Sequence, residues 1–229
     1  MNKTLLSLLL LALAPAAASA HDGFYVGGGF GRSDYSDTLF RQITKAYNGS
    51  PDYTVDSANL KDHSDNAWKV TVGYDFLPWL GAELAWTDAG AANSVYRLQP
   101  KPLLNTGPVN ARGHYELDGT SLALVGKWPI GDAFEVSVRG GFVASRLKYS
   151  EHGQDVPGQF YDFNGPTDSS TNGLAGLGLA WRVAQQWDVR LDWDRWFDVG
   201  SSYSQNQHDN GRFGNVDLYT VNVLYHFDK

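Results

Sequence analysis

The sequence of 229 residues contains no cysteine. A domain of this size must therefore fold without disulfides, and thiol or cysteine-ligated metal chemistry is excluded. Positive charge is also scarce, with a net charge of -7 at neutral pH, which argues against nucleic acid as a partner. Beyond the N-terminal leader, no segment approaches the roughly 20 apolar residues of a membrane-spanning helix. If the protein is integral to a membrane, strands must cross it and close on themselves so that all backbone groups are paired.

The beginning of the chain has the features of an export signal. Lys3 gives a basic start, residues 5–14 are apolar, and small residues precede the expected cleavage point at Ala20. This apolar stretch is too short for a membrane anchor. We predict a Sec-type signal peptide over residues 1–20, cleaved after Ala20, followed by one domain over residues 21–229.

The hairpin over residues 120–147 shows the pattern that recurs along the chain. Apolar side chains such as Leu122 and Leu124 alternate with the opposite face, and the second half of the hairpin carries Arg139 on the face opposite its apolar residues. This two-residue period is that of a β-strand. Apolar side chains on the outside and charged side chains on the inside are the signature of a transmembrane barrel.

Eight segments share this alternation, and they set the predicted fold class. It is an all-β, closed, eight-stranded antiparallel up-and-down transmembrane barrel with short periplasmic turns and four long extracellular loops. Prolines such as Pro100 and Pro108 argue against a central strand between the third and fourth segments. The expected strands lie near residues 23–33, 67–76, 79–87, 120–128, 134–147, 173–183, 187–194 and 216–227, and the expected loops near 34–65, 88–117, 149–171 and 200–214.

Aromatic residues cluster at both ends of the expected strands, as they do at the two membrane interfaces. At the short-turn end the predicted girdle consists of Trp79, Trp128, Trp187, Tyr225 and Phe227. At the long-loop end it consists of Trp68, Trp86 and Trp193, joined by Trp196 or Phe197.

Four segments carry a resemblance to a known family. FYVGGGFGRS, GAELAWTD, GKWPIGDAFEVSVRGGFVAS and DVRLDWDRW, in this order, resemble the OmpA-type eight-stranded outer-membrane barrel domain. The resemblance implies an outer-membrane protein of the Gram-negative envelope, inserted by the barrel-assembly machinery, which would read the C-terminal strand. Longer members carry a periplasmic peptidoglycan-binding domain; because the sequence ends at Lys229, we expect the transmembrane domain only.

The family plugs its barrel with ion pairs, and the resemblance implies where they lie in this chain. Glu83 takes the carboxylate position, and Arg139 and Arg190 take arginine positions. The family lysine corresponds to Val125, and Lys127 lies inward one pleat lower. A second family carboxylate corresponds to Ala180. The implied site residues are therefore Glu83, Lys127, Arg139, Arg190, Asp192 and Asp194, with either aspartate standing in for that carboxylate.

The inward charges also follow from the alternation, with five cationic against six anionic residues, a nearly neutral set. Side chains just fill the interior of an eight-stranded barrel, and a buried charge without a partner is costly, so mutual pairing is expected. Two interpretations stay open. The pairs either hold the barrel shut, or they exchange partners and open a narrow, low-conductance ion path, in which case Glu83→Ala should raise conductance.

Two other classes of function are alternatives to this structural, surface-exposed barrel. The long loops could act as an adhesin or receptor. A barrel enzyme that hydrolyses lipids or peptides would need a base beside a nucleophile, with candidates at His226 or at Asp192 and Asp194 near His114 or His208, but none has distinctive spacing. We expect no enzyme activity, no cofactor and no metal site, and a monomer whose partners are outer-membrane lipid and lipopolysaccharide.

Overall fold

The computed structural model describes residues 23–36, 53–101, 107–156, 159–165, 167–200 and 214–227, and all of its regular structure is β-strand. The predicted leader over residues 1–20 and much of the first and last predicted loops lie outside the described residues. No described helix has the length and apolar character needed to span a membrane. The strands are β1 (Phe24–Tyr35), β2 (Tyr53–Asp62), β3 (Ser64–Leu77), β4 (Leu80–Pro100), β5 (Val109–Ile130), β6 (Phe134–Val156), β7 (Gln159–Asn164), β8 (Asp168–Ala184), β9 (Trp187–Val199) and β10 (Gly214–His226).

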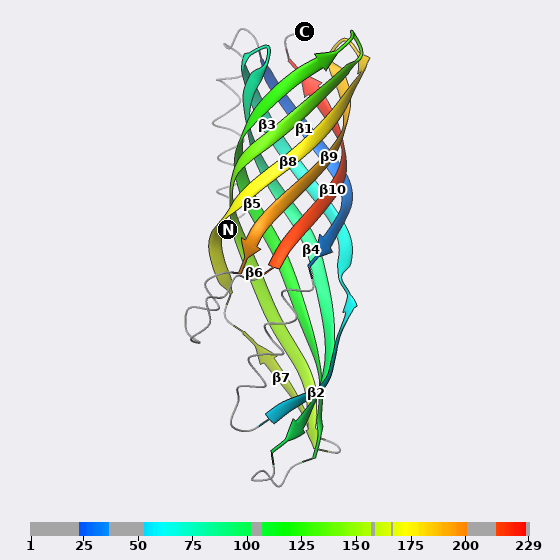
Figure 1. Cartoon of the computed structure of the whole chain (residues 1–229), viewed down its shortest axis with the longest axis vertical. Helices are drawn as coiled ribbons and strands as arrows, with labels where there is room; N and C mark the ends of the chain where they lie inside the picture. The colour runs from blue at the N-terminus through cyan, green and yellow to red at the C-terminus, as the bar shows by residue number, and fades with distance from the viewer. Residues whose placement is uncertain are drawn as a thin grey trace.

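Eight of these strands close into a barrel, as predicted (Figure 1). The antiparallel order is β4, β3, β1, β10, β9, β8, β6 and β5, and the β4–β5 pairing completes the ring. The first and last strands meet directly, with Tyr25 opposite His226 and Tyr35 opposite Val216. Every ring strand is therefore hydrogen-bonded on both sides, which leaves no edge within the barrel.

β4, β5 and β6 run far beyond the rest of the ring, and this part of the prediction was wrong. Most of the loop expected over residues 88–117 is strand, and β2 and β7 add to the outer sides of β4 and β6. A five-stranded sheet therefore projects from the long-loop end of the barrel (Figure 1). Pro100 ends β4, and Pro108 precedes β5, so neither proline is placed inside a ladder.

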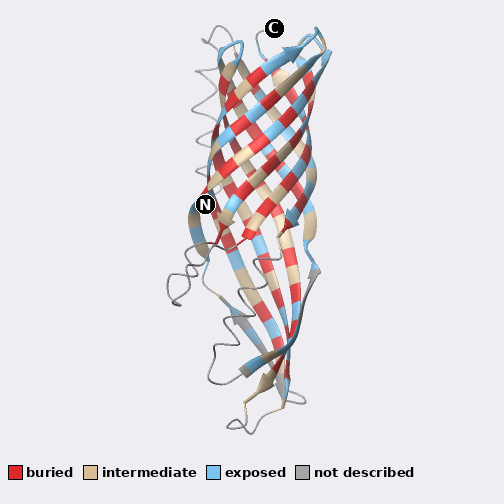
Figure 2. Ribbon diagram, in the orientation of Figure 1, coloured by how far each residue is buried: buried red, intermediate tan, exposed pale blue. Residues whose placement is uncertain are grey.

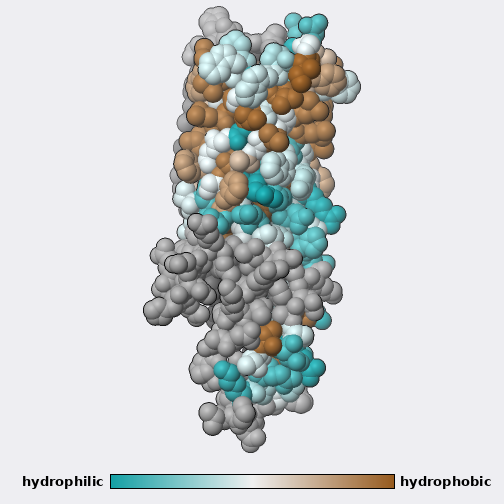
Figure 3. Space-filling model, viewed as in Figure 1, coloured by the Kyte–Doolittle hydropathy of each residue, from teal (hydrophilic) through white to brown (hydrophobic). Residues whose placement is uncertain are grey.

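Buried and exposed residues alternate along every ring strand (Figure 2). In the barrel the exposed positions are apolar and form a belt around the outside, with polar residues beyond it toward the long-loop end (Figure 3). The most exposed of the large apolar side chains include Phe30, Leu122 and Phe142. This outward apolar belt is the surface that a membrane-embedded barrel presents to lipid.

The alternation inverts at the long-loop end of the strands. On β5 the outward residue changes from Leu122 to Asp118, and the inward residue becomes Leu117. On β9 the same inversion places Arg195 outward and Trp196 inward. Above the belt the apolar side chains therefore face the barrel axis, and the polar side chains face outward, as a water-exposed sheet requires.

Candidate functional site

The centre of the lumen is filled by six ionised side chains from four strands, β3, β4, β6 and β9. Glu83 accepts two hydrogen bonds from Arg190, from Nη1 at 2.5 Å and Nη2 at 3.2 Å. Asp192 lies 2.9 Å from Arg190 Nε and accepts a 2.8 Å hydrogen bond from Arg139 Nη1. We call this set the central network; its members are Lys69, Glu83, Arg139, Arg190, Asp192 and Asp194.

Asp194 completes the central network on its long-loop side. Its two oxygens accept hydrogen bonds of 2.8 Å from Lys69 Nζ and Arg139 Nε. Asn222 donates to Asp192 at 3.0 Å and so satisfies a further oxygen lone pair. With three cations and three carboxylates, each member at most 5% exposed, the network is neutral, and every charge has an opposite charge beside it. This is the arrangement in which buried charge is tolerated.

A second polar layer lies toward the short turns. Lys127 pairs with Asp75 at 2.6 Å, one layer from the central network to which the resemblance assigned it. His226 Nε2 lies 2.9 Å from Asp188 Oδ2. Tyr25 joins the layers, because its hydroxyl donates to Glu83 at 2.8 Å while Lys127 Nζ lies 4.6 Å from its ring centre.

Apolar side chains close the lumen on the other side of the central network, toward the long loops. Trp196 is 1% exposed and is the largest fully buried side chain of the described residues. It belongs to one continuous core cluster with side chains from seven other ring strands. We call this cluster the apolar plug; its largest members are Tyr35, Tyr115, Leu117, Val143, Leu147, Leu174, Trp196, Val199, Val216 and Leu218.

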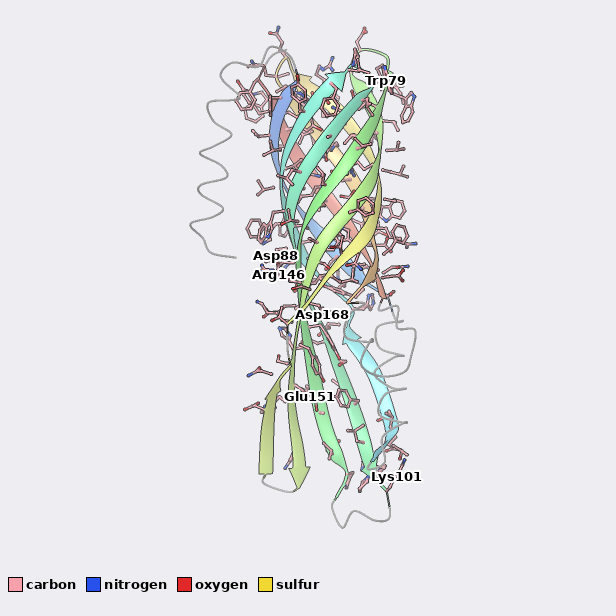
Figure 4. All side chains as sticks on the ribbon, turned by 90° about the vertical axis from the view of Figure 1, so that its left-hand side faces the viewer. Trp79, Asp88, Lys101, Arg146, Glu151 and Asp168 are labelled. Carbon is pink, nitrogen blue, oxygen red and sulfur yellow. The ribbon has the colours of Figure 1, made fainter. Side chains whose placement is uncertain are left out.

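The predicted girdle residues lie outside the barrel at the short-turn end. Trp79, Trp128, Trp187 and Phe227 are exposed, and the rings of Trp187 and Tyr225 lie 4.9 Å apart. Figure 4 shows Trp79 at this end.

At the other end the structure decides between the two candidates Trp196 and Phe197. Trp68 and Trp86 contact each other on the outside, with ring centres 4.8 Å apart, and Phe197 is exposed. Trp196 faces the lumen instead. The parity of β9 carries this information, because Trp196 continues the inward series that contains Asp192 and Asp194.

Of the residues considered for enzyme chemistry, His114 is not brought together with Asp192 and Asp194. Asp192 and Asp194 are buried in the central network, whereas His114 is partly exposed on β5 and its ring lies beside Asn93 and Glu116. His208 lies outside the described residues. Among the described residues no group of three His, Asp or Glu side chains could hold a metal ion.

Lys69, Tyr25 and Asn222 belong to the site but are not among the site residues that the resemblance implied. The inward parity of Lys69 on β3 indicates that it faces the lumen. Its partners Asp192 and Asp194 lie more than 120 positions away, however, and only the closed ring brings them within reach.

Comparison with known proteins agrees with this architecture. The model of the OmpA-like transmembrane domain family matches residues 19–229. Outer membrane protein A of Serratia marcescens is 26% identical over 211 residues, which cover 88% of this chain and 51% of the relative. The chain therefore spans about half the length of that curated relative.

Solved structures of outer-membrane barrels are similar at low sequence identity. Neisserial surface protein A has a TM-score of 0.49 and 11% identity, with 90% of this chain and 98% of the other covered. OprG from Pseudomonas aeruginosa has a TM-score of 0.47 and 14% identity, with 89% and 96% covered. The family match spans the whole described barrel, and the protein belongs to the OmpA-like transmembrane domain family of outer-membrane proteins.

Proposed function

We propose that this protein is a closed outer-membrane scaffold that displays a rigid sheet at the cell surface and passes ions only rarely. In barrels of this type the short turns face the periplasm and the long loops face the exterior. The five-stranded extension then stands outside the cell, and the route for ions through the described barrel is its lumen.

Two barriers in series along that route carry the proposal. The central network fills the mid-lumen with neutralised charge, and the apolar plug closes the exterior side. An ion crossing the plug would have to leave its hydration shell in an apolar constriction, a type of barrier that resists wetting. Exchange of partners within the central network therefore leaves the second barrier in place.

Planar-bilayer recording of purified protein tests the proposal. The wild type should show no steady conductance, and Glu83→Ala alone should leave it nearly silent because the plug remains. Trp196→Ala combined with Glu83→Ala should open a measurable path, and Phe197→Ala, which alters the neighbouring outward residue, serves as the matched control. A stable open channel in the wild type would overturn the proposal.

The extension favours contact with another surface as a second function. Its outward face carries Arg112 and His152 side by side on β5 and β6, while its inner face packs Tyr96, Leu98 and Val109 together. A folded sheet held away from the membrane loses less conformational freedom on binding a partner than a loose loop does. Binding of cells that express the protein to host cells or matrix, lost when the tip of the extension is deleted, would support this role.

The proposal includes no catalysis. The His226–Asp188 pair is buried inside the lumen, where a lipid or peptide substrate has no access. Release of ester or peptide products by the refolded protein, abolished by His226→Ala, would contradict this. We further propose a monomer, embedded in outer-membrane lipid and lipopolysaccharide, whose terminal strand β10 is read by the barrel-assembly machinery.

A further inference from the structure

Arginines face outward at only one end of the described barrel wall. Arg32 on β1, Arg146 on β6 and Arg195 on β9 all lie just beyond the apolar belt, on the long-loop side. Figure 4 shows Arg146 at this height, level with Asp88. At the short-turn end, Arg182 has the inward parity of β8 and lies 3.8 Å from Asp188. The outward arginines of the described barrel wall are therefore confined to its long-loop end.

Two of these arginines flank one strand. Tyr219 on β10 is paired with Arg32 on β1 and with Trp193 on β9, and Arg195 is the next outward residue of β9. Because only β10 separates β1 from β9, the backbones that carry the two guanidinium groups are about 10 Å apart. We call this surface the rim patch; its members are Arg32, Trp193, Arg195, Asp217 and Tyr219.

The guanidinium of Arg195 is held in a fixed orientation. Its Nε and Nη2 donate to the two oxygens of Asp217 at 2.8 Å and 2.6 Å, and Trp193 Nε1 donates to the same carboxylate at 2.9 Å. The guanidinium carbon lies 5.6 Å from the Trp193 ring centre. With Nε and Nη2 engaged, Nη1 points away from Asp217 and can serve another acceptor without reorganisation.

Arg32 makes no ion pair among the described residues, and the exposed carboxylate two positions further along β1, that of Asp34, lies against His63 instead. Arg32 Nη2 donates to Ser64 Oγ at 2.6 Å, and among the described residues no carboxylate lies within ion-pair distance of it. The opposite is true of β5 and β6, where Arg146 donates to Asp118 and Lys148 donates to Glu116. Arg146 and Lys148 each face their own carboxylate, whereas Arg32 of the rim patch has none within ion-pair distance among the described residues.

We infer that the rim patch binds a phosphate group of lipopolysaccharide in the outer leaflet. Guanidinium forks match the geometry of phosphate oxygens, and tryptophan and tyrosine are enriched where acyl chains meet head groups. Phe30 and Val221 are exposed and are the next outward residues after Arg32 and Tyr219 toward the middle of the apolar belt. They lie where the acyl chains would run. The inference rests on the orientation in the proposed function and deepens the proposed lipid partnership, but it does not depend on a closed lumen.

The test compares unfolding of the whole protein in vesicles with and without lipopolysaccharide. Phosphatidylcholine vesicles containing increasing amounts of lipopolysaccharide should raise the thermal midpoint of the wild type. Arg32→Gln combined with Arg195→Gln should raise the half-saturating lipopolysaccharide content about tenfold or more, as expected for the loss of charge-assisted hydrogen bonds. An unchanged half-saturation in this double variant would overturn the inference.

Two single variants separate ligand binding from a structural role of the ion pair. Asp217→Asn removes the carboxylate and leaves both cations, so it should lower the midpoint in all vesicles yet keep the gain from lipopolysaccharide. Arg146→Gln breaks the matched pair on the other side and should also keep the gain. If Asp217→Asn abolishes the rise in midpoint with lipopolysaccharide, the rise depends on the Arg195–Asp217 ion pair rather than on phosphate binding, and the inference is wrong. If Arg146→Gln abolishes the rise, lipopolysaccharide binds elsewhere than at the rim patch.

Other sources of phosphate distinguish lipopolysaccharide from phosphate in general. Dephosphorylated lipopolysaccharide, phosphatidylglycerol and free inorganic phosphate should each give less than half of the wild-type gain. An equal gain with any of them would overturn the assignment to lipopolysaccharide phosphate. Bilayer conductance of the same variants should match that of the wild type. Vesicle unfolding thus tests lipopolysaccharide binding, and conductance separately tests the closed lumen.

Discussion

Tyr25 and Glu83 are joined by a buried hydrogen bond of 2.8 Å across the lumen, although 58 positions separate them in the chain. Tyr25 is fully buried and its ring also lies against that of His226, with centres 5.2 Å apart. Glu83 in turn holds Arg190. This bond therefore links the polar layer near the periplasm to the central network, so disturbance of one layer should reach the other.

Removal of one partner of the Glu83–Arg190 pair should be more harmful than removal of both. Glu83→Gln removes the carboxylate that accepts from both Nη groups of Arg190 and leaves the guanidinium with Asp192 alone. Removing one partner of a buried ion pair typically costs about 3–5 kcal/mol, whereas replacing both partners by uncharged residues of similar volume is often near neutral. We expect Glu83→Gln to lower the free energy of unfolding in urea by an amount of this order, and Glu83→Gln with Arg190→Met to recover most of it. Lys148→Gln, in an exposed pair with Glu116, should change it by less than about 1 kcal/mol.

Gly73 leaves the space that the Tyr25 ring fills. A Cβ at position 73 would lie 2.0 Å from Tyr25 Cζ and 2.4 Å from its hydroxyl oxygen. Gly73→Ala should therefore displace the ring, break the bond to Glu83 and lower the urea midpoint. Gly140→Ala is the matched control, because nothing lies within 4 Å of a Cβ there. Tyr25→Ala should remove most of the penalty of Gly73→Ala, and additive effects of the two substitutions would contradict the steric explanation.

Trp196 should be the largest single apolar contribution to the exterior half of the lumen. It packs against Gly119, where an added Cβ would lie 2.9 Å from the indole ring. Truncation of a fully buried tryptophan to alanine costs about 3–5 kcal/mol, so Trp196→Ala should destabilise the barrel by this order in chemical unfolding. Phe197→Ala, at the adjacent outward position, should cost clearly less, and equal losses would argue against a packed plug.

The sequence predicted the barrel and missed the plug for the same physical reason. Within the membrane, lipid selects apolar residues on the outward face, so alternation sorted Glu83, Arg139 and Arg190 into the lumen correctly. Beyond the membrane, water selects polar residues for that face, and the alternation inverts. Burial alternates along the segment from Val109 to Leu117 as regularly as along a membrane strand. Its outward residues are polar, however, and polar composition predicts a loop.

Partner choice inside the lumen could not be read from the sequence at all. Inward parity identified the charged set, yet the pairing of Lys69 with two aspartates of β9 depends on the order in which strands close the ring. The same holds for Lys127, which pairs with Asp75 rather than with the central network. Both pairings follow from the register between strands across the closed barrel, which the sequence of one strand does not determine.

Alkaline pH should loosen the extension before the barrel. Burial, the neighbouring Tyr115 hydroxyl and the hydrogen bond to Glu151 together raise the pKa of Tyr149 above its ordinary value. A raised pKa means that the neutral phenol is favoured in the folded state, so this stabilisation is complete below the unfolded pKa of about 10 and declines as pH rises above it. Amide exchange of β5 and β6 residues in the extension should therefore accelerate above about pH 10 relative to the barrel, after correction for intrinsic exchange rates. Tyr149→Phe should abolish the difference.

The depth of the apolar belt can be measured with a single arginine moved along β5. Leu122 faces outward near the middle of the belt and is 61% exposed, whereas Thr120 lies one outward position nearer the rim. An arginine on the lipid face costs about 2–4 kcal/mol at the bilayer midplane and about 0–1 kcal/mol near the interface. Leu122→Arg should thus lower the free energy of unfolding in lipid vesicles by much more than Thr120→Arg does. If both substitutions cost the same small amount, the outward face of β5 is in contact with water rather than lipid, and the orientation on which the rim patch depends would have to be abandoned.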